Sequence, residues 1–258
     1  MRNIRKNLIT LNFVFIVIIL FFLPNDSFAK DLQSSLGFLP NILESPDKGV
    51  FVDLIKAIDE VYTEGKIEIN VYPFARSVMN IVNGIADFQM PMMGNPVIPI
   101  EKLPYRYASE KMGKVVFVIY SHRDSPISKE MIEKAQKNVK FPYIIETGRG
   151  ADIYFDFPVQ PSNGSDQSLK KVNKKRIDAY IMGQEEADFM LKNLLLKTIH
   201  RSFYYAFNDM ITIPKGKEGD EIDRIISNSI RKLKSTGRWQ ELYRKVHLPY
   251  NDWQIYNQ

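Results

Sequence analysis

Helical and strand-like segments alternate along this chain, and no other feature of the sequence constrains the fold more strongly. In residues 51–62 the apolar side chains recur at intervals of three and four, which is typical of one buried helix face. Residues 67–71 alternate like a half-buried strand, residues 75–82 again have helical spacing, and residues 86–90 resemble another strand. This order predicts βαβ units around a parallel sheet.

The alternation continues through the rest of the chain. Residues 115–120 have the length and the β-branched content of a buried strand. Asp220 is expected to cap a helix that runs to Gly237. The remaining expected helices are residues 128–136, 168–173, 185–195 and 239–246, and the remaining expected strands are residues 143–145, 177–182 and 211–213. The sequence therefore predicts an α/β protein.

The first 29 residues have the three parts of an export signal. Three cations within residues 2–6 precede an apolar run at residues 8–23, and residues 27–29 read Ser-Phe-Ala, a small-x-small cleavage pattern. The apolar run is shorter than the about 20 residues that a spanning helix needs, which favours cleavage over a retained membrane anchor. We expect cleavage after Ala29 and a periplasmic mature protein with no stable membrane insertion.

Composition excludes several classes of function. The chain has no cysteine, so it can form no disulfide, Cys-ligated metal site or Cys nucleophile, and it lacks the lipid-bearing Cys of a lipoprotein. Residues 1–29 hold three of the 35 cations and one of the 30 anions, which leaves a formal charge of +3. That charge is too small to indicate a nucleic-acid partner. The three histidines have no metal-binding spacing, and we expect neither a metal nor another cofactor.

Four motifs occur in the order that one protein family shows. Residues 49–58 resemble its opening helix, G-x-x-x-D-L-x-x-A-I, and residues 72–87 resemble its P-[WF]-x-R-[AS] block followed by G-x-A-D. Residues 175–179 are similar to its second-lobe G-R-x-D-A, and residues 213–245 to its ending, K-G through L-K-x-G-x-W-x-x-I-Y-x-K. With these motifs the chain resembles a divergent member of family 3 of the periplasmic solute-binding proteins, the amino-acid-binding type of ABC transporters.

The resemblance implies a two-lobed periplasmic-binding-protein type II fold, in which each lobe is a mixed sheet flanked by helices and two strands form the hinge. We place lobe one at residues 30–113 and 214–258, and lobe two at residues 114–213. A small polar solute, anionic or amino-acid-like, would bind in the interlobe cleft. The resemblance also implies a monomer that passes its solute to an inner-membrane ABC permease.

Two departures distinguish this chain from the members that bind amino acids. Those members carry Thr-x-x-Arg after the Ala-Asp strand, where the Arg forks onto the α-carboxylate of the ligand. Residues 92–99 contain no Arg here. The second-lobe Asp that holds the α-ammonium would fall near residues 183–184 and is also absent. The two contacts with which those members hold an α-amino acid therefore do not carry over to this chain.

Arg76 and Arg149 are the candidates for holding an anionic group of the ligand. Arg76 opens a helix after a proline-aromatic turn, although a surface salt bridge is the alternative role. Arg149 lies between two glycines at a strand-to-helix turn, where backbone N–H groups and a helix N-terminus favour an anion. Gly-Arg-Gly is also an ordinary turn. We expect one of these two arginines to anchor the ligand.

The other candidate ligand contacts are neutral. Phe74 could form a wall of the cleft or belong to the core. Pro40 and Asn41 follow the first strand, where the resemblance implies ligand contacts, and a plain surface turn is the alternative. Met92 could line an adaptable cleft or fill the core. Gln184 could supply the polar contact of the missing Asp or lie at a solvated helix start.

Three functions remain open on this evidence. The chain could be a solute receptor, an enzyme on the same fold such as a dehydratase resembling the periplasmic cyclohexadienyl type, or a sensor subunit for a membrane partner. The sequence contains no nucleophile elbow, and a dehydratase would use a carboxylate in the cleft as its general acid. A Glu or Asp beside an anion-binding Arg would favour the enzyme. Without that pair we expect a receptor.

Overall fold

The computed structural model describes residues 30–40 and 42–253, so the expected signal peptide lies outside the described residues. The strands are β1 (Leu32–Gly37), β2 (Ile67–Glu68), β3 (Val71–Tyr72), β4 (Phe88–Met93), β5 (Arg106–Tyr107), β6 (Gly113–His122), β7 (Ile145–Thr147), β8 (Gln160–Pro161), β9 (Ala179–Gly183) and β10 (Ile199–Ile213). The α-helices are α2 (Val52–Val61), α3 (Phe74–Val82), α4 (Lys129–Ala135), α5 (Ser165–Asn173), α6 (Gln184–Leu194), α7 (Lys217–Ser235) and α8 (Arg238–Val246). The 3₁₀ turns are η1 (Ile100–Lys102), η2 (Asp152–Tyr154) and η3 (Tyr250–Trp253). None of the described helices combines the length and the hydrophobicity that crossing a bilayer requires.

The strands form one hydrogen-bonded sheet with the order β2-β1-β4-β10-β6-β9-β7-β8, and β3 pairs with β1 while β5 pairs with β10. Strands β1 to β4 are parallel to one another, and so are β7 to β9. Strands β6 and β10 run antiparallel to each other and to their neighbours. The sheet is therefore mixed, as the family resemblance implies, and not purely parallel as the local alternation alone suggests.

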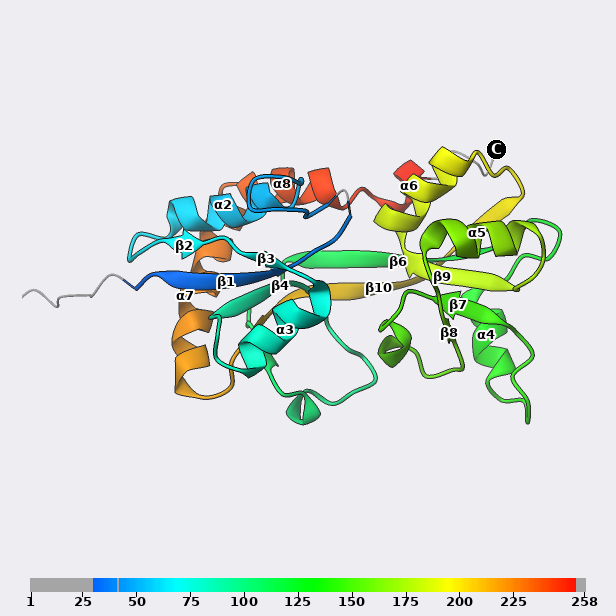
Figure 1. Ribbon diagram of the computed structural model, residues 1–258, viewed down its shortest axis with the longest axis horizontal. Coiled ribbons are helices and arrows are strands. Elements are labelled where there is room, and N and C mark those ends of the chain that lie inside the picture. The colour runs from blue at the N-terminus through cyan, green and yellow to red at the C-terminus, as the bar shows by residue number, and fades with distance from the viewer. Residues whose placement is uncertain (1–29, 41, 254–258) are drawn as a thin grey trace, which may run out of the picture. The chain divides into compact units, whose positions relative to one another are not determined.

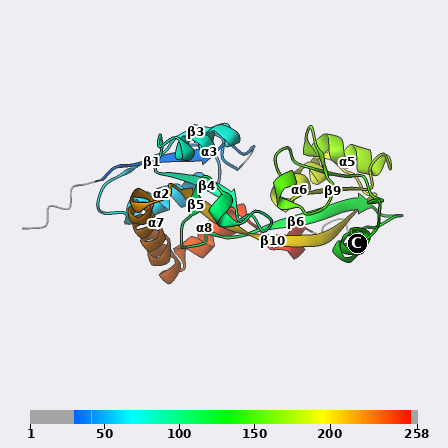
Figure 2. The ribbon, with the colours of Figure 1, turned by 90° about the horizontal axis from the view of Figure 1, so that it is seen from below.

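Strands β6 and β10 lie side by side and run from the first group of strands to the second (Figures 1 and 2). Strand β10 is 15 residues long, whereas the sequence pattern predicted only residues 211–213. A register shift between Phe203 and Tyr205 inserts an extra residue into β10. This bulge interrupts the apolar alternation, which is why the upstream part of the strand escaped detection.

Apolar side chains cover both groups of strands. The main core on the first group of strands contains Leu54, Ile58 and Ile226. The second group of strands, β7 to β9, has a core on each face of the sheet. The buried members of those two cores all lie within residues 117–207. Leu54 and Ile58 of the first core lie within residues 51–62, so the helical periodicity of this segment marks a core face, as predicted.

Helix α7 begins before the residue that we expected to cap it. Gly216 adopts a φ of 84°, a left-handed conformation that glycine takes readily, and the helix starts at Lys217. Asp220 thus lies inside the helix, where its carboxylate accepts a hydrogen bond from Arg106 Nη2 at 2.7 Å. The prediction of Asp220 as an N-cap is wrong, because the glycine turn starts the helix earlier.

Candidate functional site

The carboxyl ends of the two sets of parallel strands face each other. Met93, the last residue of β4, pairs with Asp209 of β10, which also pairs with Gly113 at the start of β6. Gly183, the last residue of β9, pairs with Phe117 further along β6. Strand β4 flanks β10 and runs with β6, whereas β9 flanks β6 and runs against it, so their carboxyl ends point toward each other along the sheet without overlapping.

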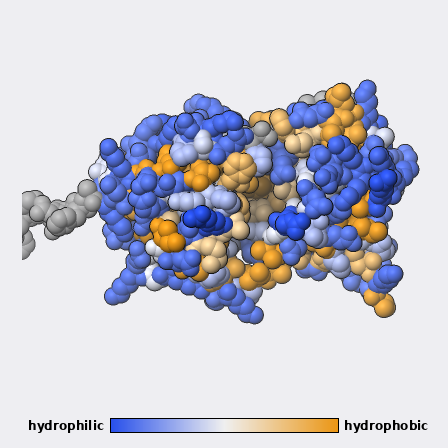
Figure 3. Space-filling view, in the orientation of Figure 1, coloured by the Kyte–Doolittle hydropathy of each residue, from blue (hydrophilic) through white to orange (hydrophobic). Residues whose placement is uncertain are grey.

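An interval on the two long strands separates these strand ends. It covers residues 113–117 of β6 and residues 205–209 of β10, or about 13 Å at 3.3 Å per residue. Ligands of open α/β sheets bind beyond the carboxyl ends of the strands. The space-filling view is hollowed between the two groups of strands, with a paler, more hydrophobic floor and hydrophilic residues at the rim (Figure 3). This interval is the candidate functional site.

Two exposed guanidinium groups follow the facing strand ends. Arg76 lies in the first turn of α3, directly after β3, and its guanidinium carbon is 5.4 Å from the ring centroid of Tyr72. Arg149 follows β7, and its Nη2 donates a hydrogen bond to Asn163 Oδ1 at 3.1 Å. The described residues offer neither guanidinium a carboxylate within ion-pair distance. Both positive charges are therefore available to an anion.

The turn that carries Arg149 differs from the one we expected. The segment after Gly150 forms only η2, a 3₁₀ turn of three residues, and not an α-helix. Such a turn has no aligned row of peptide dipoles. The prediction that a helix N-terminus helps this position to bind an anion is therefore wrong. Any anion contact at this position depends on the side chain of Arg149 and the backbone of the turn.

Phe74 covers the end of β1. It is the first residue of α3, and a Cβ added to Gly37 would come within 2.5 Å of Phe74 Cδ2. The ring thus packs on the backbone at Gly37, while 38% of Phe74 stays exposed. Pro40 lies in an exposed turn after β1, and Asn41 lies outside the described residues. The structure therefore brings Phe74 and Arg76 to one side of the site and Arg149 to the other.

Met92 and Gln184, the remaining sequence candidates, are buried beside the site. Met92 belongs to a small core cluster, and the hydroxyl of Tyr154 lies 3.5 Å from its sulfur. Gln184 is the first residue of α6, and its Nε2 donates to the carbonyl oxygen of Leu248 at 2.6 Å. Met92 thus fills the core, and Gln184 holds the segment after α8.

The loop after β4 touches the turn after β7. Tyr154 of η2 donates a hydrogen bond through its hydroxyl to the carbonyl oxygen of Met93 at 3.2 Å. Asn95 Nδ2 donates to the carbonyl oxygen of Ile153 at 3.1 Å. These two hydrogen bonds close one side of the interval between the strand ends.

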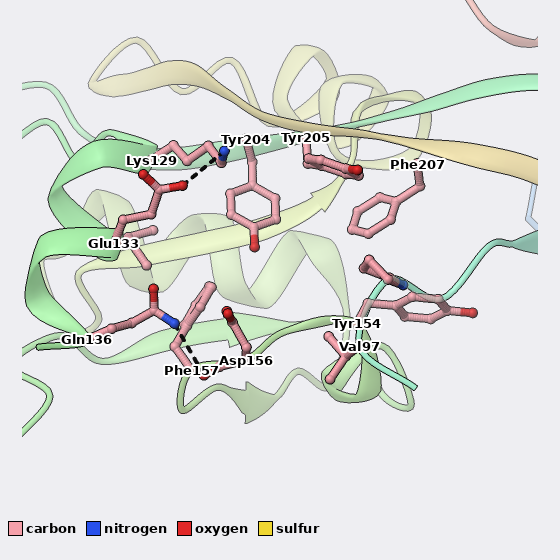
Figure 4. Close-up of a pocket in the computed structure, with 12 residues that line it drawn as sticks. Val97, Lys129, Glu133, Gln136, Tyr154, Asp156, Phe157, Tyr204, Tyr205 and Phe207 are labelled. Atoms are coloured by element: carbon pink, nitrogen blue, oxygen red, sulfur yellow. Dashed lines mark hydrogen bonds and ion pairs between the residues drawn. The ribbon is translucent and has the colours of Figure 1, made fainter. Parts of the chain in front are cut away.

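A pocket of about 220 Å³ adjoins this closed side. The side chain of Tyr204 projects from β10 into the space between α4 and the segment that carries Asp156 (Figure 4). On α4, Lys129 and Glu133 form an ion pair of 3.0 Å that lines the pocket. The aromatic residues that line it are Tyr154, Phe157, Tyr204, Tyr205 and Phe207. The pocket therefore offers aromatic side chains together with the charged groups of Lys129, Glu133 and Asp156.

Sequence reasoning missed the residues that β10 brings to the site. Lys114 Nζ donates to Asn208 Oδ1 at 2.7 Å between the two strand-end levels. Residues 203–207 carry four aromatic side chains, and such enrichment is a strand signal that could have revealed this part of β10. The partnership of Lys114 with Asn208 could not have been found in this way, because antiparallel pairing joins positions that are distant in sequence.

Comparison by sequence finds no match to a protein family and no match among curated proteins. Solved structures do resemble the chain. A histidine kinase sensor domain with similarity to periplasmic binding proteins aligns with 85% of this chain and 96% of its own, at a TM-score of 0.64 and 13% identity. The probable amino-acid ABC transporter extracellular-binding protein ytmK from Bacillus subtilis aligns with 84% of this chain and 97% of its own, at a TM-score of 0.62 and 16% identity.

The ancestral amino acid-binding protein AncCDT-1, a precursor of cyclohexadienyl dehydratase, aligns with 84% of this chain and 94% of its own, at a TM-score of 0.59 and 16% identity. At such low identities the likeness establishes the fold. The four motifs predict the same fold from sequence. The chain therefore has the two-lobed fold of the family 3 periplasmic solute-binding proteins.

Proposed function

We propose that this protein is an exported receptor that captures a small solute with an anionic group between its two lobes. The observation that supports the proposal is the placement of Arg76 and Arg149 at strand ends that face each other. An anion that leaves water needs charge-assisted hydrogen bonds, and guanidinium groups donate two parallel ones to a carboxylate. Neither arginine has a described carboxylate that would compete with the solute.

The proposal divides the chain into lobe one, residues 30–113 and 214–258, and lobe two, residues 114–213. The separation of the hydrophobic cores supports this division, since the buried members of the second lobe's cores all lie within residues 117–207. Strands β6 and β10 would then act as the hinge. A solute that contacts an arginine from each lobe would favour the closed arrangement, because only closure lets both guanidinium groups reach it.

A receptor agrees with the site better than a dehydratase does. The enzyme would need a carboxylate that faces the solute beside an anion-binding arginine. Glu185 is the first acidic residue after β9 in the sequence. Its Oε1 lies 2.9 Å from Nδ1 of His247, so this carboxylate is already paired. The structural neighbours are mostly binding proteins. We propose that the receptor acts as a monomer and delivers its solute to an inner-membrane ABC permease.

A screen by thermal shift tests the receptor proposal. Amino acids, dicarboxylates, aromatic acids and oligopeptides are added to the purified mature protein, and hits are measured by isothermal titration calorimetry. A solute at 100 times its Kd stabilises the folded state by about 2.7 kcal/mol, which raises the melting temperature measurably. If no compound of these four classes shifts the melting temperature, the receptor proposal is wrong.

Substitution of the two arginines tests the anion contact. Arg76→Ala or Arg149→Ala should weaken binding of an anionic hit at least tenfold, or about 1.4 kcal/mol. Arg176→Ala is the matched control, because Arg176 is also exposed but precedes the amino end of β9, away from the facing strand ends. Wild-type affinity in both arginine variants would refute the assignment, and Phe74→Ala would then test whether stacking holds the solute.

Export is a separate part of the proposal. We propose that a signal peptidase cleaves after Ala29, so the purified periplasmic protein should have the mass of a chain that begins at Lys30. Intact-mass spectrometry of the periplasmic fraction measures this directly. A membrane-bound form that retains residues 8–23 would overturn it.

A further inference from the structure

His247 is a buried imidazole that joins three elements. It follows α8, and its Nδ1 lies 2.9 Å from Oε1 of Glu185 in the first turn of α6. Its Nε2 lies 3.5 Å from Oδ2 of Asp209 in β10. The side chains of His247, Glu185 and Asp209 are 11%, 8% and 0% exposed. The three groups are thus largely shielded from water.

Tyr243 is the other titratable group that faces this cluster. Its ring stacks on His247 with the centroids 4.5 Å apart, and its hydroxyl lies 3.0 Å from Asp209 Oδ2. The same hydroxyl lies 3.2 Å from the backbone oxygen of Lys114 in β6. The described elements around His247 therefore present two carboxylates and a phenol to it.

The protonation state of His247 decides whether the two carboxylates face a positive charge. A protonated imidazole donates from both ring nitrogens, whereas a neutral one donates from a single nitrogen. Burial opposes the charged form, but the interactions with the carboxylates of Asp209 and Glu185 outweigh it and raise the pKa of His247 to about 9. Loss of the proton would leave both buried carboxylates without a cationic partner, which is strongly unfavourable.

The segment after α8 lies against the second lobe. The carbonyl oxygen of Leu248 accepts the hydrogen bond from Gln184, and the ring of Tyr250 lies 4.9 Å from the guanidinium carbon of Arg201. We call residues 247–253 the C-terminal strap. Figure 1 shows the chain passing from α8 toward α6 along this route. The strap therefore connects the lobes on the α6 side, in addition to β6, β10 and the hydrogen bonds that Met93 and Asn95 form with η2.

We propose that protonated His247 makes the C-terminal strap a pH-controlled tie that restrains movement of the second lobe against the first. The consequence for solute capture rests on the receptor function proposed above, whereas the tie itself does not. When His247 is neutral, Glu185 regains solvation only if α6 moves away from α8. The lobes then sample a wider range of separations, and the fraction that is ready to bind falls.

The absence of cysteine in the chain permits a direct test by site-specific labelling. Met79→Cys in α3 and Lys174→Cys after α5 place one spin label on each lobe, at exposed positions. Pulsed electron resonance then measures the distance distribution between the labels, without any solute, at about pH 7 and at about pH 10. We expect a narrow distribution at the lower pH and a broader one at the higher pH.

Three variants test whether His247 causes the broadening of the distance distribution at the higher pH. In the doubly labelled protein, His247→Gln should give the broad distribution at both pH values. His200→Gln, which changes a partly buried histidine of β10 outside the cluster, should behave like wild type. Glu185→Gln should move the midpoint of the broadening to lower pH, because it removes one of the charges that favour the protonated imidazole.

The outcomes separate this inference from the receptor proposal. An unchanged wild-type distribution across the pH range, or a His247→Gln distribution as narrow as wild type at both pH values, would overturn the tie. If His247→Gln does not fold, the Glu185→Gln variant decides. An unshifted pH midpoint of the broadening in that variant would refute the inference. None of these measurements uses a solute, so they leave the binding results for Arg76 and Arg149 to be judged independently.

Discussion

Arg201 and Asp188 place opposite charges inside the second lobe. Nε and Nη2 of Arg201 donate to the two carboxylate oxygens at 2.7 and 2.6 Å, and the hydroxyl of Tyr120 donates to Oδ1 at 3.0 Å. Burial raises the pKa of Asp188 to about 6, although the adjacent Arg201 opposes that rise. Desolvation thus offsets much of the attraction, and the two-pronged geometry pairs the two charges directly.

We predict that Asp188→Ala destabilises the protein by about 3–5 kcal/mol, because Arg201 would remain buried without a partner. The double variant Asp188→Leu/Arg201→Met should recover most of that loss, since it removes both charges. Urea unfolding measures the free energies. Arg224→Ala is the control, because its pair with Glu64 is exposed and should contribute about 1 kcal/mol or less. A double variant as unstable as Asp188→Ala would contradict the prediction.

At the scale of elements, α8 packs closely on the start of β6. A Cβ at Gly113 would lie 2.3 Å from Cε1 of Tyr243, so only glycine permits this approach. Trp239 Nε1 donates to the carbonyl oxygen of Met112 at 2.7 Å and fixes the first turn of the helix. This packing places the end of α8, with His247, beside α6 and β10.

The junction of α6, α8 and β10 predicts a pH-dependent stability. The pKa of His247 is about 9 in the folded state, above its ordinary value of 6.5, so its contribution is complete below about pH 6.5 and is lost as the pH rises through 9. A shift of this size corresponds to about 3 kcal/mol. Urea unfolding should show His247→Gln destabilised at about pH 6, with the difference shrinking by about pH 10. A pH-independent difference would refute this linkage.

At the scale of the whole molecule, the separate cores suggest that the lobes lose structure in separate steps. Ile181 belongs to a core of the second lobe and Ile226 to the core of the first, and both are fully buried. Because the two cores share no buried residue, damage to one should leave the protection of the other largely intact.

Native-state hydrogen exchange tests this expectation together with the proposed lobe boundaries. Ile181→Ala should cost about 2–5 kcal/mol and speed exchange chiefly within residues 114–213. Ile226→Ala should do so chiefly within residues 30–113 and 214–258. A uniform rise across all three ranges in both variants would show that the two lobes unfold as one unit.

Local patterns gave most of the secondary structure but only part of the site. Residues 51–62 and 115–120 behave as predicted, since their apolar spacing reports a face that must be buried whatever the partner is. The bulged upstream part of β10 and the 3₁₀ turn after Arg149 do not follow from local spacing. Both depend on how the chain packs after distant strands have paired.

The sequence by itself determined the alternation of helices and strands, and through four ordered motifs it determined the fold. Only the tertiary structure decided which strand ends face each other and that His247 meets Glu185, which is 62 residues away in the sequence. The reason is physical. Periodicity records the burial of neighbouring residues on one element, whereas the pairing of β6 with β10 and the docking of α8 depend on contacts between elements whose sequences carry no mark of their partners.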